Sequence, residues 1–337
     1  MNDPLIVVRV IHFVATIQAA GVVLFTAIII TPAFRAAKDA SLVALRVRLR
    51  RIALASLALV VMSGVAWLIL IAEQASDRPL DAVFAEGVIW TLVTQTQFGH
   101  DWVLRLILAG LLAGLLSRVQ PARWSRLQSC GAVAVAASLA GTLAWAGHAA
   151  ATPGFEGNVH RAADVLHLIA ATAWVGSLIP LAMLLKAAHD QPDGMSTVVV
   201  QKAVLRFSTL GIASVAMLLA TGTVNAWILT GTIPALVGTD YGRLLLVKVA
   251  LFLAMVSIAA VNRFRLTPRL IEKTSTIATR DALRQLRRNS LIEAATAATI
   301  LSIVAVLGTM PPGLHRHATW PFSTPLNADQ MNVHEHM

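Results

Sequence analysis

The feature that most constrains this chain is a series of eight apolar runs, each close to the length of a membrane-spanning helix. A helix needs about 20 apolar residues to cross the hydrocarbon core of a bilayer. Charged residues make up only 13% of the chain, about half the share that a soluble domain carries. The sequence therefore predicts an all-α polytopic membrane helix bundle with eight transmembrane helices, at about 4–30, 52–72, 102–117, 127–147, 162–185, 207–229, 243–262 and 289–310.

The basic residues indicate how these spans are oriented. Twenty of the 27 Lys and Arg residues fall in alternate loops, at 31–51, 118–126, 186–206 and 263–288. Basic loops face the cytoplasm, so both termini are predicted to face outward. The net charge of +10 is explained by this topology, and we expect the bilayer as a partner and no nucleic acid. Loop 73–101 is predicted outside, with a short interfacial helix over 79–90.

Three pairs of spans share a spacing of marker residues. A histidine and a glycine are nine residues apart in the first and fifth spans, an arginine and a glycine are sixteen apart in the second and sixth, and a basic residue follows a glycine by six in the third and seventh. These pairs are His12 with Gly21 and His167 with Gly176, Arg48 with Gly64 and Arg206 with Gly222, and Gly99 with Arg105 and Gly242 with Lys248. They predict two parallel four-helix repeats, and parallel repeats occur among transporters.

The duplication divides the chain into three parts. Residues 1–126 form the first repeat, with spans one to three and the outer loop 73–101. Residues 127–310 contain the fourth span and the second repeat. Residues 311–337 form a polar, histidine-containing tail that the topology places in the periplasm.

Histidines gather on the predicted outer side. Imidazole is a ligand for copper, zinc, nickel and iron, so this asymmetry favours an outer face that handles metal. The alternative is chance together with a histidine-rich tail. Nine of the ten histidines lie outside or in the outer half of a span: His12, His100, His148, His160, His167, His315, His317, His334 and His336.

The densest cluster opens the fifth span. His160, Asp164 and His167 are spaced by four and three residues, which places them on one face of a helix. His148 precedes them across a short loop and is predicted to join them. Two imidazoles and a carboxylate on one stripe are typical of a metal-binding or proton-relay surface. Alternatively, the loop histidines are solvated and Asp164 pairs with Arg9.

Four further polar residues lie within apolar spans. Ionisable residues inside a membrane indicate function by default, which applies to His12 and His167, although each could instead hydrogen-bond a neighbouring helix. Arg105 and Lys248 either extend outward to the interface or neutralise an aspartate, with Asp101, Asp240 and Asp164 as candidates.

Several chemistries are not expected. A single cysteine excludes a disulfide framework and CxxC sites. The chain has no GxxxxGK[ST] phosphate loop, so no nucleotide is expected. Because no hydrolase pattern is evident either, we expect a protein that is not an enzyme.

Three segments resemble the copper resistance protein D family of bacterial inner membranes. They are Asp164-Val-Leu-His167-Leu-Ile-Ala-Ala-Thr-Ala-Trp174-Val-Gly176, Gly147-His148-Ala-Ala, and Tyr241-Gly-Arg-Leu-Leu-Leu-Val-Lys248. The resemblance implies a multi-pass, eight-helix inner-membrane protein that takes copper delivered in the periplasm, beside a copper-binding partner of the copper resistance protein C type. It singles out His148, Asp164 and His167, whereas His12 is added by the internal repeat alone.

These expectations combine into one function. Copper is the transported substrate, imported from periplasm to cytoplasm in copper resistance and homeostasis. His160 and the tail histidines would capture it, and His148, His167 and His12 would pass it inward, with Asp164 tuning the charge. One alternative is a b-type haem redox protein that uses His12 and His167 as iron ligands. A second is a membrane scaffold or regulatory partner without a site of its own.

Overall fold

The computed structural model describes residues 3–34, 40–77, 79–118, 124–147, 154–190, 197–271 and 276–313. Within these ranges the secondary structure is helical, and eight helical segments are long and apolar enough to cross a membrane. The predicted all-α bundle of eight transmembrane helices is therefore confirmed. Several segments run well beyond the apolar runs, because the helices continue into the polar and basic residues at the membrane surface.

The first four spans are α1 (Asp3–Leu24) with η1 (Phe25–Ile30) and α2 (Thr31–Ala33), α3 (Ala40–Ser76), α6 (Gln97–Arg118), and α7 (Arg126–Gly141) with η3 (Thr142–Ala146). The last four are α8 (Gly154–Val175) with α9 (Leu178–Asp190), α10 (Thr197–Thr230), α12 (Asp240–Val261) with η5 (Asn262–Leu266) and α13 (Thr267–Ile271), and α14 (Thr276–Leu307). The segments η1 and η5 are π-helical, and η3 is a 3-10 helix.

The loop between the second and third spans contains two short helices in place of the single one predicted over 79–90. These are α4 (Leu80–Ala85) and α5 (Val88–Gln95). Gly87 separates them with a φ of 71°, a left-handed conformation that glycine adopts without a steric penalty. The corresponding connection in the second half contains α11 (Ile233–Gly238).

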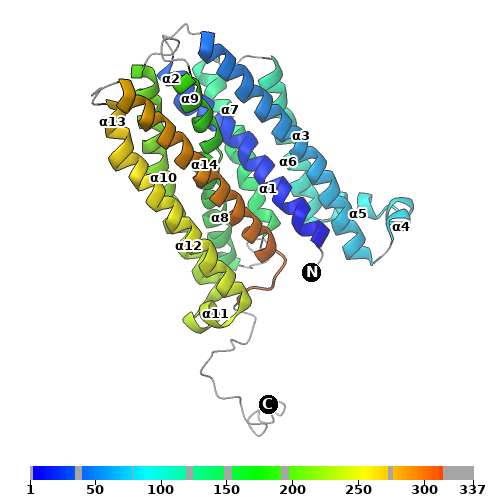
Figure 1. The fold of residues 1–337 in the computed structure, drawn as a ribbon. Coiled ribbons are helices and arrows are strands. Elements are labelled where there is room, and N and C mark those ends of the chain that lie inside the picture. The colour runs from blue at the N-terminus through cyan, green and yellow to red at the C-terminus, as the bar shows by residue number, and fades with distance from the viewer. Residues whose placement is uncertain are drawn as a thin grey trace.

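The short helices mark one end of the bundle. Figure 1 shows α4, α5 and α11 at the end where α1 begins, and α2 and α13 at the opposite end. That opposite end therefore carries the start of α3 and the segment from η5 to α14, which are rich in Arg. The N-out, C-out orientation remains a prediction from this charge bias.

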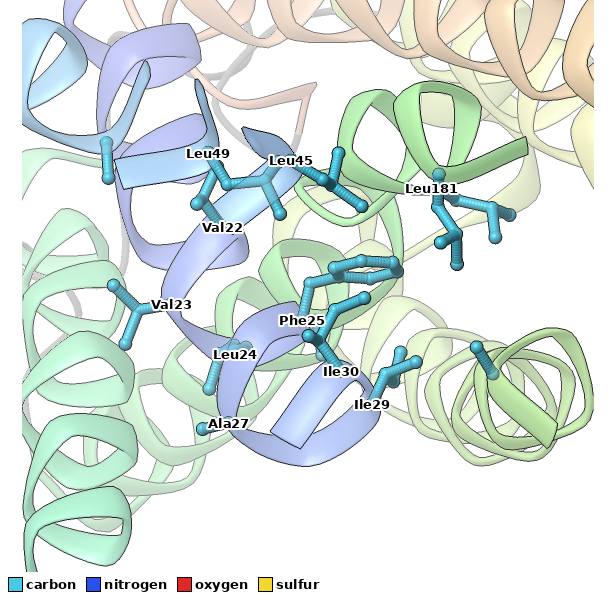
Figure 2. Close-up of a cluster of buried hydrophobic side chains, with 14 of the residues drawn as sticks. Val22, Val23, Leu24, Phe25, Ala27, Ile29, Ile30, Leu45, Leu49 and Leu181 are labelled. Atoms are coloured by element: carbon cyan, nitrogen blue, oxygen red, sulfur yellow. The ribbon is translucent and has the colours of Figure 1, made fainter. Parts of the chain in front are cut away.

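The centre of the bundle is α1, which packs against α3, α7, α8 and α14. Its π-helical extension carries Phe25, Ile29 and Ile30, all fully buried. Figure 2 shows these three side chains among others from α1, α3 and α9 that form the main hydrophobic core. The second half of α1 is almost wholly buried, while Val7, Ile11 and Val14 of its first half are exposed apolar residues, so neither half needs a polar face.

Helices α1 and α8 cross at two glycines. A side-chain carbon added to Gly21 would overlap the backbone of Gly176, and one added to Gly176 would overlap the backbone of Gly21 and Ile17. Small residues allow such close approach of helices in membranes. The glycines paired by the nine-residue spacing thus contact each other directly.

Candidate functional site

The predicted site residues of the fifth span line one cavity of about 140 Å³. His160, Asp164 and His167 reach it from α8, since residues spaced by four and three share a helix face. The facing walls come from α1, α10, α12 and α14, with Asn225, Tyr241 and Lys248 among the lining residues. We call this space the histidine cavity.

A neighbouring hydroxyl orients His167. Its Nδ1 lies 3.0 Å from Thr221 Oγ1, and the Thr221 hydroxyl already donates to the Met217 carbonyl oxygen at 2.7 Å. Thr221 therefore accepts from His167, which places the ring proton on Nδ1. A histidine that ligates a metal usually donates its other ring N–H in this way. The lone pair of Nε2 is thus available to a metal ion or a hydrogen-bond donor.

The other polar groups of the cavity have defined partners. Asp164 accepts a hydrogen bond from Asn225 Nδ2 at 3.1 Å. Arg9 donates to the carbonyl oxygens of Gly308 and Ala146, at 3.1 and 3.2 Å. The alternative pairing of Arg9 with Asp164 is therefore not the arrangement found, because Arg9 instead holds the ends of η3 and α14 together.

The histidine cavity combines acidic and basic side chains. Its lining includes one acidic residue, Asp164, and two basic ones, Arg9 and Lys248. His160 is 1% exposed, so its imidazole belongs to the interior and is not a solvated loop residue. Imidazole and carboxylate groups are ligands of transition metals, and positive side chains beside them oppose the binding of a cation.

His12 occupies a separate position. It is 1% exposed, its Nδ1 lies 3.0 Å from Ser63 Oγ, and its ring packs edge-on against Trp67 at 5.4 Å between centroids. Its Nε2 is buried and has no hydrogen-bond partner among the described residues. His12 does not line the histidine cavity, so it does not face the space that His167 faces.

The surroundings of His12 and His167 match in detail. The Ser63 hydroxyl donates to the Leu59 carbonyl oxygen, as the Thr221 hydroxyl donates to the Met217 carbonyl oxygen. Each hydroxyl oxygen can therefore accept from the Nδ1–H group of its histidine. A side-chain carbon on Gly64 would lie 3.5 Å from His12 Cε1, and one on Gly222 would lie 3.4 Å from His167 Cε1. These paired contacts support the internal duplication.

The intramembrane basic residues Arg105 and Lys248 do not extend outward to the interface, which was one of the two expectations for them. Arg105 is 3% exposed and donates from Nε and a terminal nitrogen to Oγ1 and the carbonyl oxygen of Thr142, at 3.2 and 2.9 Å. Lys248 turns into the histidine cavity. Of their proposed partners, Asp240 lies 3.9 Å from Arg243, and Asp101 accepts from Gln97 at 3.0 Å.

The remaining predicted residues lie elsewhere. His100 is exposed on α6, with Nε2 3.1 Å from the Thr94 carbonyl oxygen. His148, His315, His317, His334 and His336 fall outside the described residues. Among the ranges that are described, no three His, Cys, Asp or Glu side chains are grouped closely enough to hold a metal ion. A metal in the histidine cavity would therefore recruit water or a further residue.

Two supporting residues, Thr221 and Asn225, were missed from the sequence. A signal was present for Thr221, because a hydroxyl residue directly precedes each of the matched glycines, in Ser63-Gly64 and Thr221-Gly222. Nothing in the sequence distinguishes Asn225 from other polar residues near the end of a span.

Comparisons with known proteins agree with this architecture. The family described as copper resistance protein D matches residues 201–307, and the N-terminal domain of copper resistance protein D-like proteins matches residues 1–158. No solved structure matches the chain.

Named relatives cover most of the chain. Copper resistance protein D of Pseudomonas syringae pv. tomato is 33% identical over 225 residues, which is 66% of this chain and 71% of that protein. Inner membrane protein YebZ of Escherichia coli is 33% identical over 224 residues, 66% of this chain and 72% of its own. Copper transport protein CutJ of Bacillus subtilis is 32% identical over 185 residues, 54% of this chain and 33% of its own. The chain therefore belongs to the copper resistance protein D family.

Proposed function

We propose that this protein is an inner-membrane copper permease that imports copper from the periplasm to the cytoplasm. The observation that carries the proposal is the convergence of His160, Asp164 and His167 on one cavity inside the bundle. The names of the relatives, which concern copper resistance and copper transport, support copper as the metal. We expect no enzymatic activity, since the cavity presents ligands and no arranged nucleophile and base.

The residues have distinct roles in this proposal. His167 binds copper through Nε2 because Thr221 holds its Nδ1–H. His160 supplies a second imidazole, and Asp164 offsets part of the positive charge of the ion and of Lys248. Weak binding suits transport, because an ion that is held too tightly does not leave.

Other histidines take outer or separate roles. His148 and the tail histidines would raise the local copper concentration outside the cavity. A periplasmic copper-binding protein of the copper resistance protein C type is the proposed donor. His12 is proposed as the matching metal residue of the first repeat, residues 1–126. Access to its buried Nε2 would require the side chains around it to move.

A pair of histidine variants tests the proposal. Cells that produce the wild-type protein should accumulate more copper than cells without it. His167→Ala should abolish this excess, while His100→Ala, which changes an exposed histidine outside the cavity, should retain it. Both variants should be inserted in the membrane at the wild-type level. Normal accumulation with His167→Ala would contradict the site, and reduced accumulation in wild-type cells would contradict import.

A further inference from the structure

Four of the helices around the histidine cavity also line a second cavity, nearer their other ends. Its volume is about 330 Å³, and its walls come from α8, α9, α10, α12, η5, α13 and α14. The single acidic residue of its lining is Glu293 of α14, so we call it the glutamate cavity. Helices α8, α10, α12 and α14 contribute to both cavities.

A thin apolar layer separates the two cavities. It consists of Ala170, Trp174, Leu178, Leu218, Met255 and Ala297. On α12, Met255 falls between Lys248 of the histidine cavity and Val256 of the glutamate cavity. On α14, Ala297 falls between Glu293 of the glutamate cavity and Leu301 of the histidine cavity. Trp174 of α8 belongs to the layer and also lines the glutamate cavity. An ion that leaves the histidine cavity along the bundle axis therefore crosses this layer and enters the glutamate cavity.

Glu293 has one occupied and one free carboxyl oxygen. Its Oε1 accepts from Asn262 Nδ2 at 2.7 Å, and Asn289 Nδ2 in turn donates to Asn262 Oδ1 at 2.7 Å. Its Oε2 is buried without a hydrogen-bond partner among the described residues, and the whole residue is 1% exposed. The π-helical segment η5 begins at Asn262, and π-helical turns often occur at functional sites.

The groups around Glu293 leave its charge largely uncompensated. Helices α8 and α9 face the cavity with apolar side chains, α10 with Ser208 and α13 with Thr267. Arg263 of η5 is the other charged lining residue, and its guanidinium donates to Ser208 Oγ at 2.6 Å. The other basic residues of these helices, which include Arg206, Arg265, Arg287 and Arg288, do not line the glutamate cavity. A carboxylate in such surroundings requires a bound cation or a proton.

We propose that Glu293 is a proton-exchange site on the copper path. When the glutamate cavity is empty, the carboxyl group carries a proton on Oε2. When a copper ion enters, the O–H bond breaks, its electron pair stays on Oε2, and the proton leaves to water on the side of the basic loops. The carboxylate then neutralises one charge of the ion, so one proton is released when a copper ion enters the cavity. When the ion leaves, the carboxylate takes up a proton from water again, and no electron is transferred in either step. This proposal depends on the transport function proposed above.

The test measures copper entry and proton release in the same vesicles. Purified protein is reconstituted into liposomes that contain a pH-sensitive dye, and copper is supplied outside. Wild-type protein should release protons together with copper entry. Glu293→Gln keeps a carbonyl oxygen as the acceptor for Asn262 but has no acidic proton to release. It should bind copper in the histidine cavity with wild-type affinity and lose the copper-dependent proton release, and Glu293→Asp should recover it.

The infrared spectrum of the wild-type protein gives a second readout. This measurement does not depend on whether a variant folds. The C=O stretch of a protonated buried carboxylic acid should disappear on copper addition, and the change should be missing in Glu293→Gln. Absence of this change in the wild-type protein, or proton release that persists in Glu293→Gln, would overturn the exchange site. Copper binding that survives His167→Ala would instead contradict the proposed function, so the two failures are distinguishable.

Discussion

The hydroxyl of Thr221 offers the sharpest test of the histidine cavity. Thr221→Val keeps the shape of the side chain but removes the oxygen 3.0 Å from His167 Nδ1. The ring N–H then lacks its acceptor, which costs about 1–3 kcal/mol when buried, and nothing holds the proton on Nδ1. Loss of such a partner to a metal-ligating histidine typically weakens metal affinity by about 10–100-fold, or about 1.4–2.8 kcal/mol.

The matched variants of this experiment come from the chain itself. Thr221→Ser should retain wild-type copper affinity, because Ser63 plays the same part towards His12. Ser63→Ala should leave the affinity of the histidine cavity unchanged, because His12 does not line it. Affinity is measured by titrating copper against a competing chelator in detergent. Wild-type affinity in Thr221→Val, or an equal loss in Ser63→Ala, would refute the assignment of His167 Nε2 as a ligand.

Three further outcomes are expected. Gly176→Val should lower the melting temperature in detergent, because the valine side chain would overlap the backbone of α1 and such overpacking costs about 1–3 kcal/mol. Gly110→Val should leave the melting temperature unchanged, because Gly110 faces open space. Equal melting temperatures of the two variants would contradict the close helix crossing. Met255→Leu should slow copper transport without changing copper affinity at the histidine cavity. The reason is that it removes the thioether of the apolar layer, and a thioether is a soft copper ligand. An unchanged transport rate would mean that copper does not cross this layer. Copper affinity should fall as the pH is lowered, because imidazole must be neutral to bind a metal; a titration in which affinity rises would argue against histidine ligands.

The fold could be predicted largely because the bilayer restricts the possibilities. A span must be apolar and helical, so the apolar runs located all eight. The break in the outer loop at Gly87 was missed, since a left-handed glycine cannot be read from an apolar pattern. Nor does hydropathy reveal that α1 is the central helix, because a helix that faces lipid and one buried in protein are equally apolar.

Site residues that lie on one helix could be grouped from their spacing in the sequence. Contacts between residues of different helices could not be predicted in this way. The spacing of Asp164 and His167 placed both on one face of α8, and both line the cavity. Thr221 and Asn225 come from α10, more than fifty residues along the chain. Arg105 was expected either to reach the interface or to neutralise an aspartate, yet it donates to Thr142 at the start of η3. The change from α-helix to 3-10 helix at that point has no marker in the sequence. Glu293 was overlooked although an acidic residue within a span is itself a signal.

X-ray absorption spectroscopy of the copper-loaded, purified protein tests the central claim most directly. We predict imidazole nitrogens among the copper ligands, together with an oxygen ligand from Asp164 or water. We also predict that His167→Ala removes an imidazole contribution while His100→Ala does not. An all-sulfur ligand shell, a spectrum unchanged by His167→Ala, or stoichiometric iron with a haem Soret band in place of copper would contradict the claim.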